Sequence, residues 1–126
     1  VVVSDCGTLI NPMIVDGQIA GGVVHGIGNA LFEWMGYDEK GQPLTTNFGE
    51  YTMPTATELI GLDLQYQHSP TPLNPLGVKG VGETGTVPAA AAIVSAVENA
   101  LEPFGARISD YPVKPAKIVE IVRGAG

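Results

Sequence analysis

Apolar residues recur at helical spacing between residues 18 and 31. The recurring residues are Ile19, Val23, Ile27, Ala30 and Leu31. Asp16 and Gly17 directly precede this pattern, and the Asp16 carboxylate could accept hydrogen bonds from the first free N–H groups of a helix. We therefore predict a helix that begins near Asp16 and ends near Leu31.

Small residues form a second row on the same predicted helix. Gly22, Gly26 and Ala30 follow one another at four-residue spacing, and Gly21 and Gly28 flank them. Each glycine inside a helix costs about 0.5–1 kcal/mol relative to alanine. Such a row implies that something packs closely against the helix. We favour tight packing against a sheet, with direct contact to a cofactor as the alternative.

Four segments have the character of strands. Val1–Val3 is a short β-branched run, and residues 62–67 alternate between apolar and polar side chains, which is typical of a half-buried strand. Residues 33–37 and 44–48 are shorter candidates on either side of the turn sequence at residues 38–41. We expect these two to form a hairpin.

The most regular apolar pattern predicts a helix over residues 87–101. Pro88 suits the first turn of a helix, where its missing N–H costs nothing, and Thr84 or Thr86 could serve as the N-cap. Pro103 and Gly105 would end the helix. The predicted buried stripe consists of Ala90, Ile93, Val94, Val97 and Leu101.

Together these elements predict an α+β fold. Short mixed strands would pack with the glycine-rich helix and with the amphipathic helix at residues 87–101. We also expect a short strand over residues 106–109 and a last helix over residues 115–122.

Composition and charge narrow the classes of function. The chain has 126 residues, of which 44% are hydrophobic and 15% are charged, so it can form a core. Its net charge of −7 disfavours binding to nucleic acid or to anionic lipid. A single cysteine, Cys6, excludes an internal disulfide framework. No apolar run is long enough to span a membrane. Because the chain opens directly on Val1–Val3, we expect it to be a piece of a larger protein.

The segment from Lys79 to Thr86 carries the clearest functional signal. It places one carboxylate, Glu83, among three glycines and directly before the predicted helix at residues 87–101. Glycines let the main chain approach another molecule closely, and a helix N-terminus supplies free N–H groups. A proline-rich loop at residues 69–77 leads into this segment, and a stiff loop of that length usually has a function. The alternative is that Glu83 only stabilises the helix dipole.

Other polar side chains give weaker signals. Gln18, in the first turn of the glycine-rich helix, could donate and accept hydrogen bonds at a cofactor, although a solvent-exposed side chain is the common alternative. His25 and His68 have no metal-ligand spacing, and we expect both to be structural. For Cys6 we expect a buried, unreactive thiol. We predict no metal ligand in this chain.

Several motifs in the same order resemble one enzyme family. They are Asp5-Cys6-Gly7, Ile10-Asn11-Pro12, Asp16 to Gly22, Gly26 to Leu31, Lys79-Gly80-Val81-Gly82-Glu83 and Leu101 to Gly105. In this order they resemble the C-terminal part of the molybdenum-binding subunit of the xanthine dehydrogenase and aldehyde oxidase family. The likeness is strongest to the large chains of aerobic carbon monoxide dehydrogenases, and it spans residues 3 to 122. It implies that residues 1–126 form one lobe of a molybdopterin-binding domain.

The resemblance implies a molybdenum hydroxylase that oxidises an aldehyde, an N-heterocycle or a similar small substrate with water as the oxygen source. Glu83 would be the base that takes a proton from a metal-bound hydroxyl or water. Gln18 would contact the pterin. The remaining cofactor contacts would come from Lys79, Gly80, Val81, Gly82, Thr84, Gly85 and Thr86.

The resemblance also implies cofactors and partners. The cofactor would be molybdopterin with molybdenum, in the cytosine dinucleotide form. The partners would be the remainder of the molybdenum subunit together with iron–sulfur and flavin subunits that carry 2Fe–2S clusters and FAD, all in the cytoplasm. The family's upstream cofactor-binding segments and the copper-carrying cysteine loop are missing from these residues, so we expect neither carbon monoxide oxidation nor activity of the isolated chain. Two alternatives are a non-catalytic assembly lobe and a generic phosphate-binding module.

Overall fold

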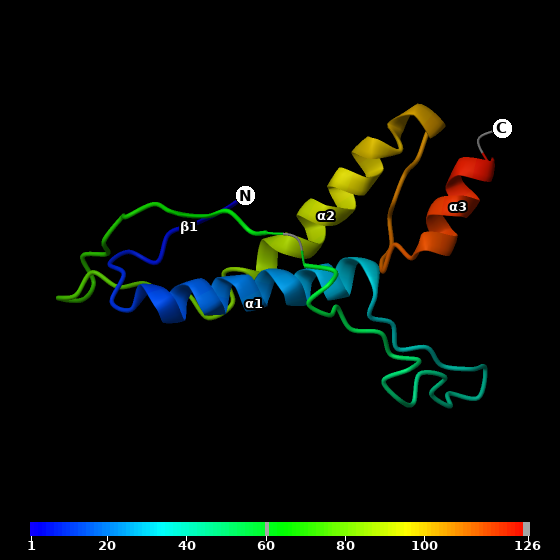
Figure 1. Cartoon of the computed structure of the whole chain (residues 1–126), viewed down its shortest axis with the longest axis horizontal. Coiled ribbons are helices and arrows are strands. Elements are labelled where there is room, and N and C mark those ends of the chain that lie inside the picture. Colours follow the sequence, from blue (N-terminus) through cyan, green and yellow to red (C-terminus); the bar gives the residue numbers. More distant parts are fainter. Residues whose placement is uncertain (60, 125–126) are drawn as a thin grey trace.

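The computed structural model describes residues 1–59 and 61–124, and it is built around two long helices (Figure 1). Within those residues the elements, in chain order, are β1 (Val2–Ser4), α1 (Pro12–Leu31), β2 (Leu64–Tyr66), α2 (Thr86–Ala100), the 3-10 turn η1 (Glu102–Phe104) and α3 (Pro115–Gly124). This arrangement fits the predicted α+β class. Among the described residues, no helix is long and apolar enough to cross a membrane.

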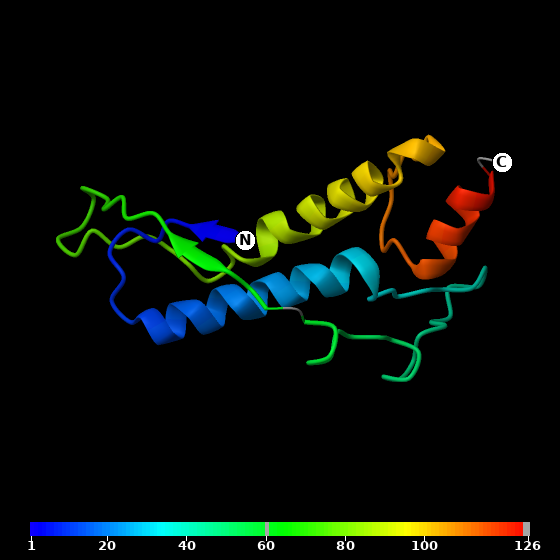
Figure 2. The same ribbon diagram turned by 45° about the horizontal axis from the view of Figure 1, so that its top comes forward.

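The two strands lie side by side and parallel along α1 (Figure 2). Val2 pairs with Leu64 and Ser4 with Tyr66. Both strands were predicted: β1 has the expected length but begins one residue later, and β2 is shorter than the alternating pattern over residues 62–67. Because β1 and β2 form the whole of this sheet in the described residues, the outer edge of each strand has no partner there.

Helix α1 begins four residues before the predicted start at Asp16. Asn11 is its N-cap, with the Asn11 side chain accepting a hydrogen bond from Ile14 N at 3.3 Å, and Pro12 occupies the first turn. Asparagine at the cap followed by proline is a favoured helix start, since the proline has no N–H to leave unpaired. Asp16 therefore does not cap the helix, and its carboxylate accepts a hydrogen bond from the Tyr66 hydroxyl.

Helix α2 packs against α1 at the row of small residues. Both views place the N-terminal end of α2 beside the middle of α1 (Figures 1 and 2). A Cβ atom added at Gly22 would lie 2.9 Å from Thr86 N, and one at Gly26 would lie 2.4 Å from Ala89 Cβ. From the other side, a Cβ atom at Gly85 would lie 2.3 Å from the Ile19 carbonyl oxygen. The prediction of close packing at this row is confirmed, but the partner at Gly22 and Gly26 is a helix and not a sheet.

The core lies where α1 meets the strands. Its buried residues are Cys6, Val15, Ile19 and Val23, and Val2, Leu64 and Val81 are among those that pack against it. Cys6 is 4% exposed, which confirms the expected buried thiol. At the other end of α1, Val113 is buried and its N–H donates to the Ala30 carbonyl at 2.7 Å, which fixes the segment before α3 to α1.

The predicted hairpin at residues 33–48 is formed only in part, because the chain reverses there but neither arm is a strand. Asp38 forms the turn, and its carboxylate accepts hydrogen bonds from the N–H groups of Lys40 and Gln42. Beyond that turn an antiparallel bridge between Tyr37 and Pro43 joins the two arms, and Leu44 N donates to the Gly36 carbonyl at 2.8 Å. Proline at position 43 cannot donate a ladder hydrogen bond, and a short two-stranded hairpin is only marginally stable alone.

The bounds of α2 and α3 are close to those predicted, but the N-cap of α2 differs from the prediction. Gly85 occupies its N-cap position without a side-chain hydrogen bond, so neither Thr84 nor Thr86 caps the helix. The Glu83 carbonyl instead accepts hydrogen bonds from Thr86 N and Val87 N. No strand forms over residues 106–109, and α3 extends two residues beyond its predicted end.

We predict that Gly26→Ala destabilises the protein by about 1–3 kcal/mol, because the new methyl group would force α1 and α2 apart. Gly17→Ala, also in α1, is the matched control, since a Cβ atom there meets nothing within 4 Å. We expect it to stabilise the protein by about 0.4–1 kcal/mol. Urea unfolding of the cofactor-free protein measures both. Equal stability of the two variants would contradict the packing described here.

Candidate functional site

One hydrogen bond joins the two segments that the sequence singled out. Gln18 Nε2, on α1, donates to the Gly82 carbonyl oxygen at 2.7 Å, although the two residues are 64 positions apart. The bond is possible because α2 packs against α1 nearby and brings the preceding loop over the first half of α1. Gln18 and Glu83 therefore lie on the same side of the molecule.

Two adjoining cavities meet at Glu83. The first has a volume of about 730 Å³ and the second about 510 Å³, and both are lined by Gly82, Glu83 and Val87. Gly80, Val81, Thr84 and Pro88 complete the first. Gln18, Gly21, Gly22, His25 and Thr86 complete the second. The Glu83 side chain is exposed, and it stands at the junction of the two hollows.

Gly80 and Gly82 leave the wall of these cavities bare. A Cβ atom at either position would meet nothing within 4 Å, and neither residue has a positive φ. Nothing in the described residues therefore requires glycine there. The same is true of space around Gly21, which faces the second cavity from the middle of α1. Main chain without side chains is suited to close approach by another molecule.

Lys79 and Gly85 have structural contacts instead. Lys79 Nζ lies 2.8 Å from Asp5 Oδ2, and Lys79 N donates to the Cys6 carbonyl at 2.8 Å, so this residue fastens the loop to the chain after β1. Lys79 lines neither cavity. Gly85 is buried against the Ile19 carbonyl of α1.

Asp5 joins three segments of the chain near the start of the glycine segment. Besides Lys79, its carboxylate accepts hydrogen bonds from Gly7 N at 2.9 Å and Ser69 N at 3.2 Å. The hydrogen bond from Lys79, followed by that from Gly7, holds the pKa of Asp5 below its usual value of 3.8. Asp5 thus ties the proline-rich loop and the glycine segment to one point.

Of the two histidines, one lies at the site and one does not. His25 was expected to be structural, but its side chain is exposed and lines the second cavity with Gln18 and Glu83. The signal available in the sequence was its spacing of seven residues from Gln18, which puts both on one helix face. His68 Nδ1 lies 3.4 Å from the Gly7 carbonyl, away from these cavities.

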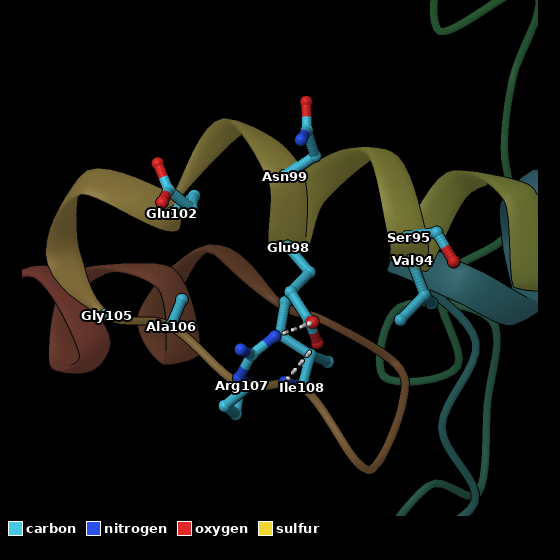
Figure 3. Close-up of a pocket in the computed structure, with 9 residues that line it drawn as sticks. All are labelled: Val94, Ser95, Glu98, Asn99, Glu102, Gly105, Ala106, Arg107 and Ile108. Carbon is cyan, nitrogen blue, oxygen red and sulfur yellow. Dashed lines mark hydrogen bonds and ion pairs between the residues drawn. The ribbon is translucent and has the colours of Figure 1, made fainter.

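A separate cavity of about 450 Å³ lies at the C-terminal end of α2 (Figure 3). Glu98 points from the helix toward the following segment. It accepts hydrogen bonds from Ile108 N at 2.7 Å and from Arg107 Nη1 at 3.1 Å. These two contacts, that from Ile108 first, lower the pKa of Glu98. None of the predicted site residues lines this cavity.

Comparison with known proteins gives this geometry a context. The model of the molybdopterin cofactor-binding domain matches residues 1–60. The chain is 44% identical over 122 residues to the nicotine 6-hydroxylase large subunit of Paenarthrobacter nicotinovorans. The aligned region covers 97% of this chain and 15% of the relative. It is 38% identical to the putative xanthine dehydrogenase molybdenum-binding subunit of Escherichia coli K12, over 98% of this chain and 16% of that one.

The chain belongs to the molybdenum-binding subunits of the xanthine dehydrogenase family. The expected likeness to carbon monoxide dehydrogenases is confirmed, but it is not the strongest, because the nicotine 6-hydroxylase large subunit is more similar. The large chain from Afipia carboxidovorans is 40% identical over 76% of this chain and 12% of its own length.

The fold agrees with the solved structures of such enzymes. Quinoline 2-oxidoreductase from Pseudomonas putida 86 superposes with a TM-score of 0.93 at 41% identity, over 96% of this chain and 15% of that one. The chain thus spans about 15% of the length of the relatives that it matches.

The residues around Glu83 fit a molybdopterin-type cofactor. The bare main chain at Gly80 and Gly82 offers carbonyl and N–H groups to a planar polar molecule, and Gln18 Oε1 can accept a further hydrogen bond. Among the described residues, no group of three His, Cys, Asp or Glu side chains could hold a metal ion.

We predict that Gln18→Ala frees the loop over α1, because the side-chain donor to Gly82 is lost. Hydrogen exchange of the amides in residues 80–85 should speed up severalfold, since a hydrogen bond of this kind contributes about 0.5–1.5 kcal/mol. Gln65→Ala, in β2 and away from the site, is the control. Unchanged exchange in the Gln18 variant would show that the bond does not hold the loop.

We predict that Asp5 makes stability depend on acid pH. Its pKa is lower in the folded protein, so its contribution is present above pH 3.8 and is lost as the pH falls from there through the folded pKa. Asp5→Asn should lower the melting temperature at pH 7 and flatten its fall below pH 4. The control is Glu120→Gln, at an exposed position of α3. Parallel melting curves for Asp5→Asn and the unmodified protein would refute this role.

Proposed function

We propose that this chain forms one wall of a molybdenum hydroxylase active site. The overall reaction would be RH + H₂O → ROH + 2H⁺ + 2e⁻. The supporting observation is that Gln18, bonded to Gly82, shares a cavity with Glu83. When bound, the cofactor supplies the water-derived oxygen and accepts the two electrons. Residues 1–126 would act as a lobe of the molybdopterin-binding domain.

Glu83 is the base in this proposal. Its carboxylate lies at the junction of the two cavities, and the backbone carbonyl of the same residue is fixed by Thr86 N and Val87 N. The main chain is thus held by α2 while the side chain remains free to reach a bound substrate. A base in this position takes the proton from the attacking oxygen. Removal of this proton makes the oxygen nucleophilic enough to form the C–O bond.

The cofactor contacts in this proposal divide into two groups. Gln18 and the segment Gly80 to Thr84 would touch the pterin directly, since they line the cavities. Thr86 would contribute from the start of α2. Lys79 and Gly85 would hold the glycine segment in place rather than touch the cofactor, since Lys79 pairs with Asp5 and Gly85 packs on α1. The cofactor form that we propose is the cytosine dinucleotide.

For the substrate we favour an N-heterocyclic compound over an aldehyde. The names of two relatives, nicotine 6-hydroxylase and quinoline 2-oxidoreductase, indicate such compounds, and both are more than 40% identical to this chain. An electron-poor ring carbon next to nitrogen accepts a nucleophilic oxygen readily. Electrons would pass to iron–sulfur and flavin subunits with 2Fe–2S clusters and FAD, in the cytoplasm.

A role in subunit assembly is the second candidate. Many large apolar side chains are exposed, among them Val1, Met13, Phe48, Leu73 and Val87. Exposed apolar surface of this extent marks contact with other protein. Assembly and catalysis differ in what they require of Glu83, because packing does not depend on its charge.

We predict that Glu83→Gln in the complete enzyme lowers turnover by about 10²–10⁴-fold, because the amide cannot accept the proton. The molybdenum content should stay at the level of the unmodified enzyme. Glu102→Gln, in η1 beyond α2, is the matched control and should retain activity. Steady-state assays with an N-heterocyclic substrate, together with metal analysis, measure both quantities. Full turnover by Glu83→Gln would favour the assembly role.

A further inference from the structure

We propose that His25 is a further cofactor-binding residue, whose imidazole donates a hydrogen bond to an anionic phosphate of the cofactor. This inference rests on the proposed function, because it assumes that the cavity beside Glu83 holds a molybdopterin-type group. From the sequence alone, His25 was expected to have only a structural role.

The position of His25 follows from helix geometry. Gln18 and His25 are seven residues apart, two helical turns, so they project from the same face of α1. Gly21 and Gly22 lie between them, and neither carries a side chain that would obstruct the space between Gln18 and His25. His25 is exposed, and its side chain lines the second cavity. Its donor is therefore available to a ligand.

Charge favours a phosphate as the group that His25 contacts. Glu83 is acidic and the whole chain carries a net charge of −7, so an anionic cofactor needs a donor or a cation on this wall. Of the side chains that line the two cavities, only that of His25 can become positively charged. Lys79 is the nearest lysine in sequence to Glu83, but its ammonium group is paired with Asp5.

The positions of the adjoining cavities also favour a phosphate at His25. A further cavity of about 530 Å³ continues past His25, and it shares Thr86 and Val87 with the cavity that contains Gln18. Asn29, one turn beyond His25 on α1, lines this continuation. A groove thus runs from Gly80 past Gln18 and His25 toward Asn29. With a pterin at Gln18, an elongated cofactor places its phosphates farther along α1, at His25.

The test is cofactor retention by the complete enzyme. After dialysis, we expect His25→Ala to retain about tenfold less cofactor than the unmodified enzyme, since a hydrogen bond to a charged group contributes about that factor to affinity. The retained cofactor is measured as molybdenum and as the nucleotide released when the dialysed protein is denatured. His25→Gln should retain an intermediate amount, because its amide also donates. His68→Ala is the matched control and should retain the full amount. Thermal melting of the dialysed proteins checks that all variants fold.

The outcomes separate this inference from the proposed function. If the unmodified enzyme contains cofactor and His25→Ala retains just as much, the role of His25 is refuted and the proposed function stands. If the unmodified enzyme contains neither molybdenum nor a pterin, the proposed function itself is refuted. A loss in His25→Ala that His25→Gln partly restores supports a hydrogen-bond donor at this position.

Discussion

The close contact between α1 and α2 is the constraint on which the rest of the structure depends. It requires three glycines, at positions 22, 26 and 85, because any side chain there would overlap the opposite helix. With the helices this near, the loop before α2 lies over the first half of α1 and Gln18 can reach the Gly82 carbonyl. The glycines that cost helix stability in isolation thus determine where the only carboxylate of that loop is held.

The sequence was most informative where one pattern had one physical explanation. The row of small residues on α1 predicted a close neighbour, and the apolar spacing after Thr86 predicted α2 within one residue at each end. The family resemblance assigned Gln18 and the glycine segment to the same cofactor, but the hydrogen bond that joins Gln18 to Gly82 was not predicted. It could not be derived from spacing, because it depends on how two helices pack against each other.

The errors came from motifs with two readings. Asn11-Pro12 can interrupt a helix or start one, and here it starts α1, because the Asn11 side chain accepts a hydrogen bond from Ile14 N and Pro12 has no N–H that needs a partner. Residues 33–48 have strand-like composition, but Pro43 and the lack of a neighbouring sheet in the described residues leave only one bridge. His25 was assigned a structural role because it lacks metal-ligand spacing, and its spacing of seven residues from Gln18 indicates a shared helix face but not a cavity beside that face.

The small size of the sheet has a practical consequence. In the described residues, β1 and β2 have no further strand on their outer edges, so the main-chain groups there are unpaired within the sheet. The side chain of Val3, in the middle of β1, is 63% exposed. Each strand has only three residues, and edges this short are poor templates for strands of other molecules. The exposed apolar side chains, rather than the sheet edges, are therefore expected to make a preparation of residues 1–126 alone prone to aggregation.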